Sequence, residues 1–205
     1  MVLKYCLKEG RTECGIDETG YGSLIGSLYT CAVILPPYEY LSNTFLQNIK
    51  DSKKIKPEDR NYLRGIIENE VEDYSIGIAT KEEIDEMNSY HANMLAMHRA
   101  LDGLSLEVDH ILVDGNRFKP YKNISHTTVV RGDGTYLSIA AASILAKEYR
   151  DEYIRELCIK DETLVDRYNV IQNMGYPVHE HTDGIQKYGY SKYHRKSYVV
   201  KSITI

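Results

Sequence analysis

The sequence contains no tryptophan, only two phenylalanines and only four cysteines in 205 residues. The cysteines are Cys6, Cys14, Cys31 and Cys158, and none forms a Cys-x-x-Cys pair, which argues against a zinc site or a redox motif. Their spacing does not resemble a disulfide framework either, so we expect free thiols in a reducing compartment. No apolar run approaches the roughly 20 residues that span a bilayer, and the first residues lack the apolar core of a signal peptide. We therefore expect a soluble, cytoplasmic protein that does not bind membranes.

Positive charge is also in short supply, because 25 basic residues face 30 acidic ones and the formal net charge is -5. Taken alone, this balance argues against nucleic acid, which favours basic surfaces. An enzyme that holds metal ions needs clustered acids, however, so the distribution of charge matters more than its sum. A chain of this length and 42% hydrophobic content fits one globular domain with a sizeable core, and a monomer is the default expectation.

The most informative stretch is residues 14–22, where Asp17 and Glu18 end an expected strand and Gly20-Tyr21-Gly22 follows. Successive side chains of a strand point to opposite faces, so adjacent acids can share one target only where the strand ends. Glycine lets the chain bend there and lets a ligand approach the backbone. This pattern suggests a divalent cation beside a phosphate, although an isolated Asp-Glu pair is more often solvated surface.

Hydrophobic periodicity along the chain predicts an α/β fold. Strands are expected at 1–18, 28–35, 74–80, 111–114 and 127–131, and a short helix or loop at 41–49. Helices are expected at 57–70, 81–103, 137–157 and 179–187. Thr80 and Glu83 have the spacing of a capping box, and the helix that they begin should break near Asn88-Ser89. The 137–157 helix is rich in alanine and serine, so it should pack very close to the sheet.

Two more expected strands end in a carboxylate beside glycine, at Asp114 and at Asp133. Sites in α/β sheets form where strand ends converge, so we expect these acids to meet Asp17 and Glu18 in one pocket. Oxygen ligands of this kind suit Mg²⁺ or Mn²⁺ rather than zinc. Two such ions about 4 Å apart would support an in-line displacement at phosphorus.

Basic residues gather in two places, each of which can be read as a phosphate-binding surface or as a solvated face. The first group follows the second strand and contains Lys50, Lys53, Lys54, Lys56, Arg60 and Arg64. The second lies near the end, interleaved with tyrosines that can pack on sugars and bases, and contains Lys187, Lys192, Arg195, Lys196 and Lys201.

Several motifs in a fixed order now identify a family. They are Gly15-Ile16-Asp17-Glu18, Asp51-Ser52-Lys53, Val113-Asp114-Gly115-Asn116-Arg117, Gly132-Asp133, the run from Ser138 to Lys147 with Arg150-Asp151, and His194-Arg195-Lys196-Ser197. From about Gly15 to Tyr198 the chain resembles type 2 ribonuclease H, the ribonuclease HII family. The resemblance implies a ribonuclease H-like fold, a mixed five-stranded sheet flanked by helices, in a single catalytic domain. Residues from about 160 to 205 would form a C-terminal helical part beside the substrate cleft.

The resemblance also implies an activity: metal-dependent cleavage of RNA in RNA–DNA hybrids, and cutting 5′ to a lone ribonucleotide in duplex DNA. Products would carry 3′-hydroxyl and 5′-phosphate ends. The family's catalytic, metal-binding carboxylates fall on Asp17, Glu18, Asp114 and Asp133. Asp151 matches a family position too, but it lies far into a helix, where a surface pair with Lys147 is the favoured interpretation.

Substrate contacts implied by the resemblance fall on Gly20, Tyr21, Gly22, Ser52, Lys53, Tyr176 and Arg195. The Gly20-Tyr21-Gly22 turn would read the ribose 2′-hydroxyl, and Tyr176 would pack on the following sugar. Tyr21 replaces the usual arginine and Met174 a usual lysine, so positive charge is lost near the substrate. Two alternatives stay open: a DNA nuclease or resolvase on the same kind of fold, and a non-catalytic binder of nucleic acid.

Overall fold

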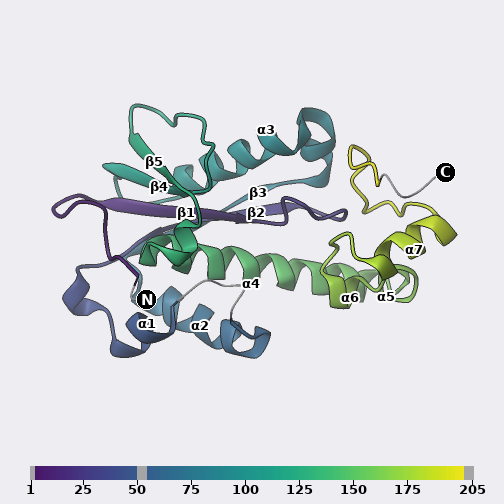
Figure 1. The fold of residues 1–205 in the computed structure, drawn as a ribbon, viewed down its shortest axis with the longest axis horizontal. Helices are drawn as coiled ribbons and strands as arrows, with labels where there is room; N and C mark the ends of the chain where they lie inside the picture. The colour runs from purple at the N-terminus through teal and green to yellow at the C-terminus, as the bar shows by residue number, and fades with distance from the viewer. Residues whose placement is uncertain (1–2, 50–54, 201–205) are drawn as a thin grey trace.

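The computed structural model describes residues 3–49 and 55–200, and a mixed β-sheet runs through its centre (Figure 1). Within these residues the sheet has five strands in the order β3-β2-β1-β4-β5. β1 pairs antiparallel with β2 and parallel with β4; β2 and β3 are antiparallel, and β4 and β5 parallel. The strands are β1 (Glu13–Thr19), β2 (Leu28–Ile34), β3 (Asp73–Ala79), β4 (His110–Asp114) and β5 (Ser125–Val129). The predicted mixed five-stranded sheet is confirmed.

Two strand boundaries differ from the prediction. The first strand begins only at Glu13, whose carboxylate accepts hydrogen bonds from the N–H groups of Leu7 and Lys8 in the preceding loop. The last strand is shifted toward the N-terminus, because the His110 ring hydrogen-bonds the hydroxyls of Ser125 and Thr127 and fixes the strand there. Asp133 consequently lies beyond the strand end, in the 3-10 helix η3 (Gly132–Gly134).

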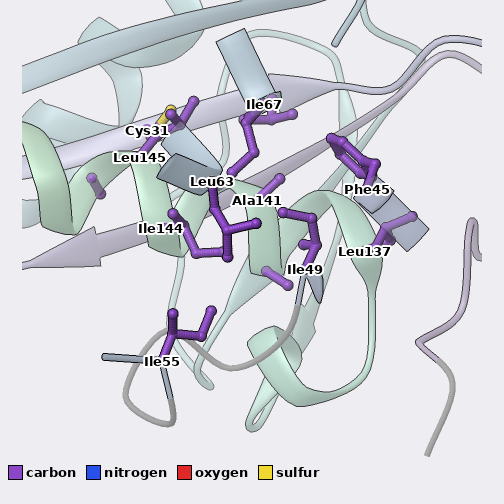
Figure 2. Close-up of a cluster of buried hydrophobic side chains, with 14 of the residues drawn as sticks. Cys31, Phe45, Ile49, Ile55, Leu63, Ile67, Leu137, Ala141, Ile144 and Leu145 are labelled. Carbon is purple, nitrogen blue, oxygen red and sulfur yellow. The ribbon is translucent and has the colours of Figure 1, made fainter. Parts of the chain in front are cut away.

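One face of the sheet is covered by α1 (Asn43–Asn48), α2 (Pro57–Glu70) and the long α4 (Leu137–Lys160) (Figure 1). Figure 2 shows the core between them, where Leu63 and Ile67 of α2 meet Ile144 and Leu145 of α4. Burying each such side chain contributes roughly 1.5–3 kcal/mol.

The predicted close packing of α4 on the sheet is also confirmed. A Cβ added to Gly15 of β1 would lie 2.4 Å from the backbone carbon of Ser138. The alanine-rich first turns of α4 therefore pack directly on β1, the strand that carries Asp17 and Glu18 near its end.

The opposite face is covered by α3 (Lys81–Asp102) (Figure 1). The capping box of Thr80 and Glu83 is present as predicted, and so is the break: Asn88 has φ +71°. The Asn88 carboxamide oxygen accepts hydrogen bonds from the N–H groups of Tyr90 and His91, which starts the second segment of the helix. A Cβ on Gly77 of β3 would lie 1.9 Å from the Ala96 carbonyl oxygen, so this segment also lies very close to the sheet.

The C-terminal part packs against the far end of α4 (Figure 1). It contains α5 (Thr163–Tyr168), α6 (Val170–Asn173) and α7 (His179–Tyr188); a further 3-10 helix, η1 (Tyr38–Tyr40), follows β2. His181 and His194 are both buried and share a hydrogen bond of 3.0 Å between their Nε2 atoms. His179, two residues before His181, instead pairs with Asp183 on the surface.

The four cysteines are free, as predicted. Among the described helices, none combines the length and the apolar character that a membrane span requires.

Candidate active site

Three of the four predicted acids line one cavity. In the parallel pairing of β1 and β4, Ile16 lies opposite Val113, so the next residues, Asp17 and Asp114, sit side by side at the strand ends. The cavity has a volume of about 320 Å³. It is lined by Asp17, Glu18 and Thr19 of β1, Asp114 of β4, Ser143 and Lys147 of α4, and Tyr176. Parallel strand ends thus bring acids about 100 residues apart in sequence into one site.

Asp17 is the most deeply placed of these acids, with 5% of its surface exposed. Burial raises the pKa of Asp17 well above its ordinary value, and the nearby carboxylates of Glu18 and Asp114 raise it further. Hydrogen bonds from the Ser143 hydroxyl and from the Glu18 N–H, 2.7 Å away, act in the opposite direction. A cation bound here would offset the repulsion among the three carboxylates and would lower the pKa of Asp17 again.

Asp133 is buried near this site but is not among the described residues that line the cavity. Its neighbour Gly132 donates its N–H to Asp114 Oδ1 at 2.6 Å, which ties η3 to the end of β4. Across the described residues, no group of three or more His, Cys, Asp or Glu side chains is arranged to hold a metal ion unaided. The donor chemistry nevertheless fits Mg²⁺ or Mn²⁺, because Mg²⁺ usually takes one or two carboxylates and completes its shell with water and substrate phosphate.

The predicted substrate-reading turn lies beside Tyr176. Gly20 has φ +86°, and its N–H donates to the Tyr176 hydroxyl at 3.2 Å. A Cβ on Gly20 would lie 2.1 Å from Arg150 Nε, whereas a Cβ on Gly22 would meet nothing within 4 Å. Of the two positions in the turn, therefore, only position 20 needs a residue without a Cβ.

Sequence reasoning missed the role of Arg150, which is fully buried beneath the turn. Its guanidinium donates to the Ser23 hydroxyl at 2.7 Å and to the Met174 carbonyl at 3.1 Å, and it lies 5.4 Å from the centre of the Tyr176 ring. Burial lowers the pKa of Arg150. The motif that contains Arg150 was recognised, but its partners lie more than 20 residues away on both sides, and no local spacing indicates them.

Arg195, which the resemblance places among the substrate contacts, is likewise fully buried. Its Nε donates to the Gly26 carbonyl at 2.8 Å and its Nη1 to the Tyr21 carbonyl at 3.1 Å. The Tyr198 hydroxyl donates to the same Tyr21 carbonyl. Arg195 is therefore a positioning residue that holds the turn from the protein side.

The first basic group proves largely structural where it is described. Arg60 is buried and pairs with Glu148 at 2.8 Å and with Asp151 at 3.3 Å. Arg64 pairs with Glu68 and Glu152. Ser52 and Lys53, both predicted to bind substrate, lie outside the described residues, as do Lys50 and Lys54.

The predicted pair of Lys147 and Asp151 is present, with Lys147 Nζ 2.5 Å from Asp151 Oδ1. The expectation of a surface pair is wrong, because Asp151 is only 1% exposed. It is compensated by both Lys147 and Arg60, and it joins α2 to α4 in a buried network. Lys147, in contrast, also reaches the wall of the acidic cavity.

Comparison with known proteins gives one consistent result. The family model for Ribonuclease HII matches residues 14–201. A Ribonuclease HII of Parabacteroides distasonis is 46% identical over 200 residues, which cover 98% of this chain and 96% of that protein. Among solved structures, ribonuclease H2 from Pyrococcus horikoshii has a TM-score of 0.73 at 26% identity, covering 91% of this chain and 93% of the other. Bst-RNase HIII in complex with Mn²⁺ has a TM-score of 0.67 at 17% identity, covering 87% and 63%.

Proposed function

Because the chain belongs to the ribonuclease HII family, and is therefore a metal-dependent ribonuclease H that cleaves RNA in RNA–DNA hybrids, we propose that it also cuts duplex DNA on the 5′ side of a single embedded ribonucleotide. Products would carry 3′-hydroxyl and 5′-phosphate ends. The observation that carries this proposal is the single cavity that joins Asp17, Glu18 and Asp114 to Tyr176, since it sets cation ligands beside a ring that can pack on a sugar.

We assign Asp17, Glu18 and Asp114 to the binding of Mg²⁺ or Mn²⁺, with Asp133 as the fourth acid. When bound, a pair of such ions would activate water and offset charge on the departing oxygen. The carboxylates are held for this task by the protein: Asp114 by the Gly132 N–H, and Asp17 by Ser143 and the Glu18 N–H. The mutual repulsion of the acids, which raises the pKa of Asp17, favours cation binding.

Ribose recognition is proposed for the backbone of residues 20–22. The Tyr21 carbonyl points inward to Arg195 and Tyr198. In a planar trans peptide the N–H of the next residue points the opposite way, so the Gly22 N–H is directed away from Arg195. An outward N–H at this position supports recognition of a 2′-hydroxyl by the main chain, which does not depend on the side chain at position 21.

Tyr176 supports the same proposal from the C-terminal part. Its hydroxyl is fixed by the Gly20 N–H, and the Arg150 guanidinium lies beneath its ring. A ring held in one orientation can pack against a deoxyribose and exclude a ribose, whose 2′-hydroxyl would clash. The C-terminal helical part would thus complete the substrate cleft.

A cleavage assay tests the proposal. Three labelled duplexes are compared in Mg²⁺, in Mn²⁺ and in EDTA: DNA with one ribonucleotide, a full RNA–DNA hybrid, and DNA alone. We expect a single cut 5′ to the ribonucleotide, products of the hybrid, no cut in DNA alone and none in EDTA. Cleavage of DNA alone would indicate the alternative DNA nuclease, and binding without any cleavage would indicate a non-catalytic binder.

A further inference from the structure

A second cavity lies on the α3 side of the same acids. It has a volume of about 280 Å³, and Glu18 and Asp114 line both this cavity and the one that contains Tyr176. The remaining wall includes Tyr21 of the turn, Tyr90 and Asn93 of α3, and Arg117 of the loop after β4. That loop is held against α3 by a hydrogen bond from the Lys119 N–H to Met94 Sδ, 3.2 Å long. The cavity is therefore bounded by three separate elements and borders the proposed cation site.

Asn93 carries an unmet hydrogen-bonding requirement. It is 94% buried, and its carboxamide oxygen has no hydrogen-bond partner among the described residues. A buried polar atom without a partner costs about 1–3 kcal/mol, so such atoms call for an explanation. A ligand that donates a hydrogen bond to Asn93 would supply the missing partner.

The other walls have the chemistry of a nucleotide site. Tyr21 is 40% exposed, and Tyr90 precedes Asn93 by one helical turn, on the same side of α3. Arg117 is exposed, and in the described part of the chain it forms no ion pair. Aromatic rings pack on bases and sugars, and an arginine free of carboxylate partners can pair with a backbone phosphate.

We propose that this second cavity is a subsite for one nucleotide next to the scissile phosphate. Tyr21 and Tyr90 pack on that nucleotide, Asn93 accepts a hydrogen bond from it, and Arg117 pairs with its phosphate. The assignment rests on the proposed function, because Glu18 and Asp114 place the subsite beside the reacting phosphate. A cavity of about 280 Å³ is at the small end for ligand sites, which suits one nucleotide rather than a duplex segment.

Two variants test the subsite, with binding of the single-ribonucleotide duplex measured in EDTA so that cleavage cannot interfere. Asn93→Leu removes the unpartnered oxygen and keeps a similar volume. We expect its Kd to rise roughly 3- to 10-fold, the effect of one lost hydrogen bond, while its melting temperature holds or rises. Arg117→Gln is expected to reduce the slope of log Kd against log salt by about 1.

Arg11→Gln is the matched control, because Arg11 is an exposed arginine at the opposite end of β1 from the acids. Its salt slope and Kd should equal those of the unmodified protein. Unchanged binding by both Asn93→Leu and Arg117→Gln would overturn the subsite. A large loss of stability in Asn93→Leu would show a structural role for Asn93. The salt slope of Arg117→Gln would then decide whether the cavity binds a nucleotide: a reduced slope would support the subsite, and an unchanged slope would overturn it.

Failure of the subsite and failure of the proposed function give different results. If the unmodified protein does not cut beside a single ribonucleotide, the proposed function is wrong. If it cuts there while both variants bind and cleave like the unmodified protein, only the subsite is wrong. Tyr90→Leu gives a third measure. Because Tyr90 is half-buried against the core, some stability is lost, and KM is measured where the variant is fully folded; loss of the packed ring should raise it.

Discussion

Replacing Gly20 by alanine is expected to destabilise the protein and to disturb the substrate-reading turn, whereas the same change at Gly22 should do neither. Gly20 has φ +86°, a region that costs a residue with a Cβ roughly 1–2 kcal/mol. The added methyl group would also lie 2.1 Å from Arg150 Nε. Arg150 has little freedom to move away, because its guanidinium donates hydrogen bonds to the Ser23 hydroxyl and to the carbonyls of Ile25, Ser27 and Met174.

Overpacking of this kind typically costs about 1–3 kcal/mol, so the two effects together give about 2–5 kcal/mol for Gly20→Ala. For a chain of this size, that corresponds to a fall in melting temperature of roughly 4–20 °C. Gly22 has no positive φ and no neighbour within 4 Å of an added Cβ, so Gly22→Ala should stay within about 0.5 kcal/mol of the unmodified protein.

The assay combines urea unfolding of both variants with cleavage of the single-ribonucleotide duplex and the full hybrid. Displacing Arg150 removes the support beneath the Tyr176 ring. If the ring then positions the substrate 1 Å away from its proper place, the rate can fall by up to about 100-fold. We expect Gly20→Ala to lose cleavage at the single ribonucleotide more than at the hybrid. Equal stability of Gly20→Ala and Gly22→Ala would refute the reasoning, because it would mean that the turn does not depend on this close contact.

Three further predictions follow from the site and the core. Asp114→Asn should abolish cleavage while the melting temperature holds or rises, since one charge that repels Asp17 is removed; a variant that fails to fold would count against a metal-site role. Tyr21→Arg should tighten binding of the ribonucleotide duplex at low salt, because it adds a positive charge while the planar guanidinium can still stack on the nucleotide in place of the ring; unchanged or weaker binding would contradict the charge argument. Burial beside His181 lowers the pKa of His194 to about 3, while an unfolded histidine titrates near 6.5. The unfolded state therefore binds more protons between these values, and stability should fall as pH is lowered below about 6.5. In urea unfolding, His194→Gln should reduce the fall in the free energy of unfolding between pH 6.5 and 5. An unchanged dependence on pH would show that the buried pair of His181 and His194 does not cause the fall.

Much of the fold was predictable because its signals are local. The capping box at Thr80, the break at Asn88 and the strand that ends in Asp114 each depend on a few neighbouring residues. The last strand was misplaced because its position depends on a contact between strands, from His110 to Ser125 and Thr127. Local patterns do not contain that contact.

The buried polar residues show the same limit. Arg195 and Asp151 are charged residues of the types usually found on protein surfaces, and both were predicted to face solvent or substrate. The structure buries them, because their charges are met by partners from distant segments: carbonyls of residues 21 and 26 for Arg195, and Arg60 for Asp151. A buried charge is tolerated only when such partners exist, and the sequence does not state which segments will supply them.

The sequence by itself determined the acidic residues, the two strands that carry Asp17-Glu18 and Asp114 near their ends, and the glycine turn, because each follows from spacing along a short stretch. The tertiary structure alone decided which acids line one cavity, that Arg150 fixes the turn and Tyr176 together, and that a second cavity opens beside Glu18 and Asp114. The reason is physical: strand register and helix docking set distances between residues that are far apart in the sequence, and those distances depend on packing of the whole core.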